Sequence, residues 1–216
     1  SKDQPILAKK GDDLRIDWGY LYTAAPQSQI SGFSVAAAGA ARRAFASTGT
    51  VPSESDLRQP RAASDDMPVS AFAFDLQQVG NQPVRRWLML AYDDLYSIQY
   101  MRRNLRPYWR RNGWEAHDLL RVAHRDFERL ARRCEAFDAE LLAVVTHAGG
   151  EKFAKICALA YRQCFAAGKF VADDNGQPLQ FSKENHSNGC IGTSDVFYPM
   201  SPQFLLFGPS VAKSFL

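Results

Sequence analysis

The spacing of apolar side chains divides this 216-residue chain into a strand-like part followed by a helix-like part. Alternation of apolar and polar positions predicts β-strands over residues 13–25 and 69–79. The Ala-rich run 33–47 fits either a helix or a strand, and we interpret it as a strand. Residues 48–68 are polar and rich in proline, which predicts a long surface loop.

The second part of the chain has the period of amphipathic helices. Apolar residues recur every three or four positions over 85–105, 115–150 and 151–171, and two consecutive glycines end the second of these runs. Three long helices in succession imply helical hairpins that pack against one another.

Charged residues within the first predicted helix constrain how it is buried. Asp93 and Asp94 would point about 100° apart on a helix, so at most one of them faces the core. A buried aspartate there would need a partner such as Arg162. The arginine-rich run 102–111 contains aromatic residues, as single-stranded nucleic-acid sites do. We instead interpret it as a solvated helix end, because Pro107 interrupts the stripe and acidic residues follow closely.

The segment after the helices is the most informative for chemistry. Asn175-Gly176 between two short apolar runs predicts a tight β-hairpin. Residues 183–203 then combine charged, amide and hydroxyl side chains with two glycines and two prolines, and no regular structure is predicted. Ordering such a polar loop requires partners for its hydrogen-bonding groups, which makes it the candidate functional segment.

Two carboxylates in this segment, Glu184 and Asp195, suit a hydrolysis in which one group donates a proton and the other activates water. They could equally brace the loop by accepting hydrogen bonds from its backbone. Asn185 and Asn188 could orient a polar ligand, or hold a hard cation together with Asp195. A calcium-binding loop pattern is absent, so we predict no metal and no cofactor.

Composition and charge argue against nucleic acids and membranes as partners. The net charge of +3 is too small to indicate nucleic acid or an anionic membrane. No apolar run is long enough to span a bilayer, so we expect neither a membrane nor a nucleic-acid partner. The four cysteines follow no zinc-binding spacing, and we expect free, buried thiols.

Three segments together resemble the glutaminase A family of fungi and bacteria. They are LAYDDLYSIQYMRRNLRPYW, RRCEAFDAELLAVVTHAGGEKFAKICALAYRQCFAAGK and QPLQFSKENHSNGCIGTSDVFYPMSPQFLLFGP. The most specific piece has the form FSKENxSNGxxxTxDVxYPxxP. One departure is Ser194, which stands where valine is expected, next to an unchanged Asp195.

The resemblance implies an α+β fold in which a β-rich N-terminal segment precedes α-hairpins of an (α/α) six-hairpin toroid. Residues 1–80 would be the end of a β-sandwich-like region and a linker, and 84–216 the opening helical hairpins, so only part of the toroid is expected here. Members of this family are longer, so the expected partner is the remainder of a longer polypeptide. The resemblance also implies a secreted or periplasmic protein, although the chain contains no signal segment.

The function implied by the resemblance is a glutaminase-like hydrolase whose small-molecule substrate is glutamine, cleaved at its side-chain amide. One of the two carboxylates would activate water, Lys183 or Arg162 would neutralise the substrate carboxylate, and two asparagines would hold the amide. The candidate catalytic residues are Glu184 and Asp195, and the candidate substrate-binding residues are Lys183, Asn185, Asn188, Arg162 and Tyr198.

Two alternatives stay open. The same toroid could carry a carbohydrate-active enzyme, with paired carboxylates for glycoside hydrolysis and aromatic rings that stack on sugars. The rings considered for that role are those of Trp109, Trp114, Tyr161 and Tyr198. The chain could also be a non-catalytic binding or structural module, which the lack of a polar cleft near residues 183–198 would indicate.

Overall fold

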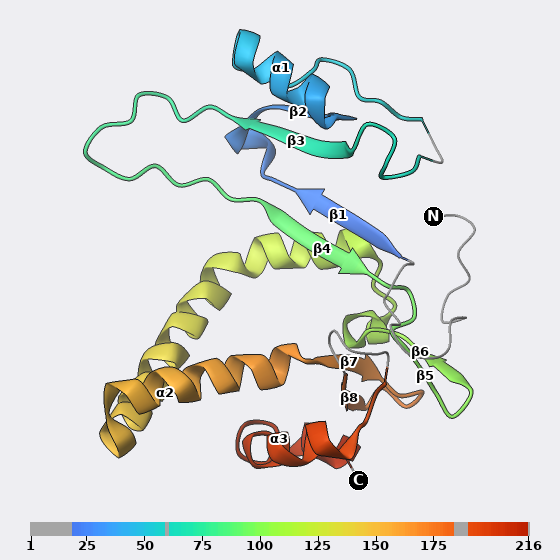
Figure 1. Ribbon diagram of the computed structural model, residues 1–216, viewed down its shortest axis with the longest axis vertical. Helices are drawn as coiled ribbons and strands as arrows, with labels where there is room; N and C mark the ends of the chain where they lie inside the picture. The colour runs from blue at the N-terminus through green and yellow to red at the C-terminus, as the bar shows by residue number, and fades with distance from the viewer. Residues whose placement is uncertain (1–18, 59–60, 184–189, 216) are drawn as a thin grey trace. The chain divides into compact units, whose positions relative to one another are not determined.

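The computed structural model describes residues 19–58, 61–183 and 190–215, and these fall into two compact units (Figure 1). The first unit contains Tyr20–Tyr92 and the second contains Asp93–Leu216. The chain is an α+β protein with a β-rich N-terminal region followed by helical-hairpin material, as predicted. Each unit is described by itself.

The first unit contains two small two-stranded sheets, one α-helix and one 3-10 helix. Its elements are β1 (Tyr20–Ala24), the 3-10 helix η1 (Gln27–Gln29), β2 (Ile30–Ala37), α1 (Ala38–Thr48), β3 (Pro68–Phe74) and β4 (Met89–Asp93). β1 pairs with β4, and β2 pairs antiparallel with β3. Ser34, Ala36 and Ala73 are buried in the second of these sheets.

The loop that precedes β3 is long, as predicted, and is attached to β2. The backbone N–H of Val35 donates to Ser55 Oγ at 3.0 Å, and the N–H of Asp56 donates to the Val35 carbonyl at 2.7 Å. Asp56 also forms ion pairs with Arg58 and Arg61, which hold the pKa of the Asp56 carboxyl well below its usual range. These bonds fix the start of the loop against the sheet.

The second unit begins with two short strands and a turn, followed by long helices. Its elements are β5 (Ile98–Tyr100), β6 (Arg103–Leu105), the 3-10 helix η2 (Tyr108–Asn112), α2 (Ala116–Ala166), β7 (Gly168–Ala172), β8 (Pro178–Ser182), α3 (Ser194–Phe207), α4 (Pro209–Ala212) and the 3-10 helix η3 (Lys213–Phe215). α2 bends back on itself at Gly150 (Figure 1). Gly150 has φ 79° and ψ 176°, a backbone conformation that is essentially restricted to glycine.

The two helical arms of α2 agree with the predicted helices on either side of the glycine pair. The second arm ends at Ala166 rather than at 171, because β7 begins at Gly168. β7 and β8 form the hairpin that Asn175-Gly176 predicted, and the Gly176 N–H donates to the Asp173 carbonyl at 2.8 Å. The strand prediction for 69–79 is also confirmed, since β3 covers its first residues.

The helix predicted over 85–105 is wrong. The structure has β4, β5 and β6 there, and Met101, placed on the predicted apolar face, is 76% exposed. The reason is local hydrogen bonding by Asp93, whose Oδ1 accepts the N–H of Leu95 at 3.0 Å while Leu95 has φ 60°. Such a side-chain bond to the backbone stabilises a turn in competition with a helix.

The predictions for the charged residues in and after this segment are also wrong. Asp93 and Asp94 are both buried, and their partners are Arg110 and Lys169 rather than Arg162. Arg110 is itself buried, so the arginine-rich run is not a solvated helix end.

Two further expectations need correction. The run 33–47 is a strand only as far as Ala37 and then forms α1, because alanine favours the helix. Residues 194–203 are helical despite Pro199 and Pro202, because the α3 side chains of Met200 and Phe204 are buried one turn apart in an apolar cluster. This burial outweighs the two backbone hydrogen bonds that the prolines cannot form.

The four cysteines are not in disulfides, as predicted, but they are not fully buried. Cys134 and Cys190 are exposed, while Cys157 and Cys164 are partly buried. Burial raises the pKa of the Cys164 thiol. Within the part of the chain that the structure describes, no helix is long and apolar enough to cross a bilayer.

Candidate functional site

The β7–β8 hairpin positions the segment that sequence analysis selected for chemistry. β8 ends at Ser182, and the next residue, Lys183, forms an isolated antiparallel bridge with Ile191. The N–H of Gly192 donates to the Ser182 carbonyl at 2.8 Å. These two contacts hold the ends of the segment together directly beside the hairpin. Glu184, Asn185 and Asn188 lie outside the described residues.

An apolar cluster fixes one face of this hairpin. Val171 and Phe181 are buried against Ile98 and Leu105, so the hairpin packs on the β5–β6 pair. The rings of Tyr100 and Phe181 lie 5.1 Å apart, centroid to centroid. The position of β8 is therefore set by core packing.

Ion pairs fasten the hairpin to the start of the second unit. Lys169 Nζ lies 2.9 Å from Asp94 Oδ2, and Asp94 Oδ1 accepts the hydroxyl of Ser97 at 2.7 Å. At the turn end, Arg103 contacts Asp173 at 2.7 Å. A backbone hydrogen bond from Asp174, together with Arg103, lowers the pKa of the Asp173 carboxyl.

A buried ion pair involves Asp93, the residue before Asp94. Both Nε and Nη2 of Arg110 donate to the carboxylate of Asp93. The Nη1 atom of Arg110 donates to Glu115 at 2.9 Å, and the hydrogen bonds to these two carboxylates raise the pKa of the guanidinium. Because both charged groups are satisfied, we assign this pair to positioning the turn after β4 rather than to chemistry.

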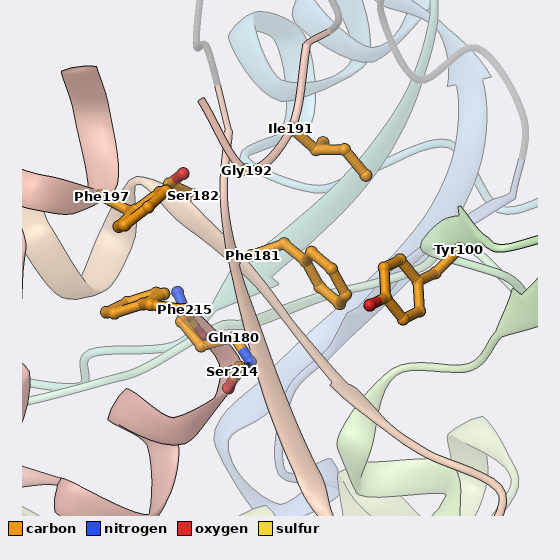
Figure 2. A pocket seen from close by; sticks show the side chains of 9 residues that line it. All are labelled: Tyr100, Gln180, Phe181, Ser182, Ile191, Gly192, Phe197, Ser214 and Phe215. Atoms are coloured by element: carbon orange, nitrogen blue, oxygen red, sulfur yellow. Dashed lines mark hydrogen bonds between the residues drawn. The ribbon is translucent and has the colours of Figure 1, made fainter. Parts of the chain in front are cut away.

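A pocket of about 250 Å³ opens beside β8 (Figure 2). Its walls combine aromatic rings, a few neutral polar side chains and three residues from the candidate segment 183–203. The lining residues are Tyr100, Gln180, Phe181, Ser182, Ile191, Gly192, Phe197, Ser214 and Phe215. The pocket is thus lined by Ser182, the residue before Lys183, and by Ile191, which pairs with Lys183.

Polar atoms without partners are concentrated at this pocket. Gln180 is 4% exposed and Ser182 is 0% exposed. Gln180 Nε2 and Ser182 Oγ have no hydrogen-bond partner among the residues that the structure describes, and the same holds for Thr193 Oγ1, adjacent to Gly192. Buried polar groups are almost always hydrogen-bonded, so this concentration requires an explanation.

Sequence analysis missed Gln180 and Ser182. Ser182 belongs to the FSKENxSNG motif but was not selected as a site residue, because two polar residues that alternate with apolar ones along PLQFS usually indicate a solvent-facing side of a strand. Their burial results from α4 and η3, which pack against β8. The sequence of the strand itself does not indicate that α4 and η3 pack against it.

The described candidate residues are distributed over three places. Lys183 lies at the pocket's edge, next to Ser182, and is partly buried. Asp195 and Tyr198 lie on the first turns of α3, both exposed, and Tyr198 is 77% exposed. Arg162 belongs to a different hollow on α2. None of the four lines the pocket beside β8.

The hollow that contains Arg162 lies between the two arms of α2 and has a volume of about 680 Å³. Its lining is mostly apolar, and it includes Tyr161, whose pKa is raised by burial. Tyr161 also packs against Phe137 and Phe207, with ring centroids 5.4 and 5.0 Å away. The hollow is therefore a helix-packing surface with a single arginine on its rim.

The aromatic residues considered for sugar stacking do not gather at one site. Trp109 lies against the guanidinium of Arg110, at 4.7 Å from its ring centroid, and the Trp114 carbonyl accepts from the same arginine. Within residues 19–58, 61–183 and 190–215, no group of three or more His, Cys, Asp or Glu residues could hold a metal ion.

The fold and the site define an α+β protein in which a β-rich region precedes helical hairpins. Residues 1–143 match the family described as a domain of unknown function, DUF5127, and residues 150–216 match the glutaminase A six helical-hairpin domain. The chain belongs to the DUF5127 family, and its C-terminal part matches the glutaminase A hairpin domain, which supports the resemblance to glutaminase A.

Two curated relatives are similar over most of this chain. Glutaminase A of Aspergillus oryzae is 29% identical over 206 residues, which cover 93% of this chain and 29% of that protein. The protein named "Probable glutaminase/05536" of Arthroderma benhamiae is 27% identical over 209 residues, covering 90% of this chain and 24% of the relative. The chain therefore spans less than a third of the length of these relatives. No solved structure matches it.

Proposed function

We propose that this chain is part of a longer glutaminase A-like hydrolase that releases ammonia from the side-chain amide of glutamine. The observation that carries the proposal is the pocket beside β8, which is lined by Ser182, next to Lys183, and by Ile191, and which holds buried polar atoms without partners among the described residues. The names of the two fungal relatives agree with this activity.

Amide hydrolysis needs a base that activates water and an acid that protonates the leaving ammonia. In the proposed reaction, a water oxygen bonds to the amide carbon, the carbon–nitrogen bond breaks, and glutamate and ammonia leave. Asp195 suits the base because it is exposed at the start of α3, where water reaches it. Glu184 is the second candidate, and Asn185 and Asn188 are proposed to hold the amide.

A cation is needed for the α-carboxylate of glutamine, and the structure favours Lys183 over Arg162 for this role. Lys183 directly follows Ser182, which lines the pocket, whereas Arg162 lines the separate hollow on α2. We therefore expect Lys183→Met to raise KM and Arg162→Met to leave it unchanged. Tyr198, exposed on the same helix as Asp195, is proposed to contact the substrate from the solvent side.

The remainder of the proposed polypeptide would cover α2. Large apolar side chains are exposed along both arms of this helix: Leu130, Leu142, Val144, Phe153, Ile156 and Leu159. Contiguous apolar surface of this kind is typical of an interface. We propose that further helical hairpins of the same polypeptide pack on it.

The aromatic lining of the pocket favours a second candidate function. Tyr100, Phe181, Phe197 and Phe215 all face the pocket, and aromatic rings bind the apolar faces of sugars. A carbohydrate-active enzyme would use the same carboxylates for glycoside hydrolysis.

Ammonia release by the full-length protein distinguishes the two functions. We expect release from glutamine, and a fall in kcat of about 10²-fold or more in Glu184→Gln or Asp195→Asn, because a positioned general acid or base contributes about 10²–10⁴-fold. Asp174→Asn, a change at an exposed carboxylate in the β7–β8 turn, is the matched control. Wild-type activity in both test variants would exclude these carboxylates, and cleavage of glycans without ammonia release would establish the second function instead.

A further inference from the structure

The geometry points to the pocket beside β8 as a subsite for a neutral carboxamide group, held by Gln180 Nε2 and Ser182 Oγ. This inference rests on the proposed function, since the carboxamide would be the side-chain amide of glutamine. It adds Gln180 and Ser182, both on β8, to the asparagines that are proposed above to hold that group.

The unpaired atoms supply a donor and an acceptor side by side on one strand. Gln180 and Ser182 are two residues apart on β8, so their side chains leave the same face. An amide –NH₂ such as Nε2 donates, and a hydroxyl both donates and accepts. A carboxamide would match them, because its carbonyl accepts from Gln180 and its –NH₂ donates to Ser182.

The absence of charge selects a neutral ligand group. None of the nine lining residues carries a formal charge, and four of them are aromatic. A carboxylate placed there would lose hydration without gaining a cationic partner from the lining, which is costly. The volume of about 250 Å³ is at the small end for ligand pockets, which suits a group of amino-acid size.

The backbone at Gln180 is held in place, and its side chain lies close to β7. The backbone N–H of Gln180 donates to Ser214 Oγ at 2.9 Å, which fixes this position of β8. A Cβ atom at Gly168 would lie 1.9 Å from Gln180 Nε2, so glycine at that position leaves room for the amide where it lies.

Titration calorimetry with the full-length protein tests the subsite, using L-glutamine and L-glutamate as probes. Wild-type protein should bind glutamine more tightly than glutamate. Ser182→Ala and Gln180→Met should each weaken glutamine binding about tenfold, the effect expected for one lost hydrogen bond. The controls are Ser210→Ala on α4 and Gln177→Met in the β7–β8 turn, both at exposed positions.

Thermal unfolding without ligand separates binding from structure. Removing an unpaired buried hydroxyl should leave the Tm of Ser182→Ala unchanged or higher, because that hydroxyl has no partner to lose. If Ser182→Ala has a Tm well below that of the wild type, Ser182→Cys replaces it, since cysteine keeps the size and hydrogen-bonds weakly. Weakened glutamine binding at an unchanged Tm supports the subsite.

The outcomes separate the subsite from the proposed function. If the wild type hydrolyses glutamine and the variants bind it as tightly as the wild type, the subsite is refuted while the function stands, and the pocket holds only water. If the wild type releases no ammonia but binds glutamine in a way that Ser182→Ala weakens, the subsite stands without the reaction. If the wild type binds no glutamine, both are refuted.

Discussion

The buried ion pair between Asp93 and Arg110 gives the sharpest test of how the second unit is stabilised. The side chains are 2% and 5% exposed, and Arg110 donates to Asp93 through two nitrogen atoms. Asp93 also accepts the N–H of Leu95 at 3.0 Å, which fixes the turn after β4. The change Asp93→Ala would remove all three bonds at once.

The magnitude follows from what is left behind. Removing one partner of a buried ion pair costs about 3–5 kcal/mol, because the other charge stays buried. We expect the lower end, about 3 kcal/mol, since Glu115 remains 2.9 Å from Arg110. The lost bond to Leu95 adds about 1 kcal/mol. The total of about 4 kcal/mol is a large share of the 5–15 kcal/mol typical of a domain.

Urea unfolding of the full-length protein, followed by tryptophan fluorescence, measures this loss. Trp109 packs on the Arg110 guanidinium, so its emission reports on this region. Arg121→Ala, which breaks an exposed pair with Asp118, is the control and should cost less than about 1 kcal/mol. A loss for Asp93→Ala no greater than that of the control would refute the reasoning.

Three other predictions follow from the same unit. Gly168→Ala should displace the Gln180 amide, destabilise the protein by about 1–3 kcal/mol through overpacking and weaken glutamine binding, as urea unfolding and calorimetry will show. The pKa of Asp173 is lowered by a backbone hydrogen bond from Asp174 and by Arg103, so these contacts stabilise the hairpin at neutral pH and are lost as the pH falls through the lowered pKa, which NMR titration of the carboxyl can follow. Iodoacetamide should label the exposed Cys134 rapidly in the isolated 216-residue chain and slowly in a full-length protein whose further hairpins cover α2.

Each of these has a result that contradicts it. Unchanged glutamine binding in Gly168→Ala would show that the position of Gln180 does not matter for the ligand. An Asp173 carboxyl that titrates at the pKa of a free aspartate would mean that the ion pair is absent in solution. Equal labelling of Cys134 in both proteins would argue against a cover on this surface.

The sequence predicted those elements whose signals are local. Asn175-Gly176 sets the β7–β8 turn by backbone chemistry alone, and two adjacent glycines mark the bend of α2. The 85–105 segment was misassigned because its apolar spacing also fits a helix. Its actual structure depends on the turn that Asp93 forms with Leu95 and on the distant partners Arg110 and Lys169, of which Lys169 lies 75 residues along the chain from Asp94.

The candidate site, too, was predicted only where the signal was local in the sequence. The motif drew attention to the segment after β8, and the structure places a pocket at the ends of that segment. Gln180 and Ser182 escaped notice because their burial depends on packing by α4 and η3, more than 25 positions further along the chain. The roles of Glu184, Asn185 and Asn188 stay predictions.

A small rotation at the Gly150 bend of α2 would cause a large displacement at the far end of the arm that follows. The arm that follows it, Glu151–Ala166, is about 24 Å long at 1.5 Å per residue. Rotating that arm by roughly 10° about one peptide unit would carry its far end, and the hairpin attached there, through about 4 Å. A side chain at position 150 would therefore change the direction of the second arm rather than the stability of the helix. A small change in that direction would displace β8.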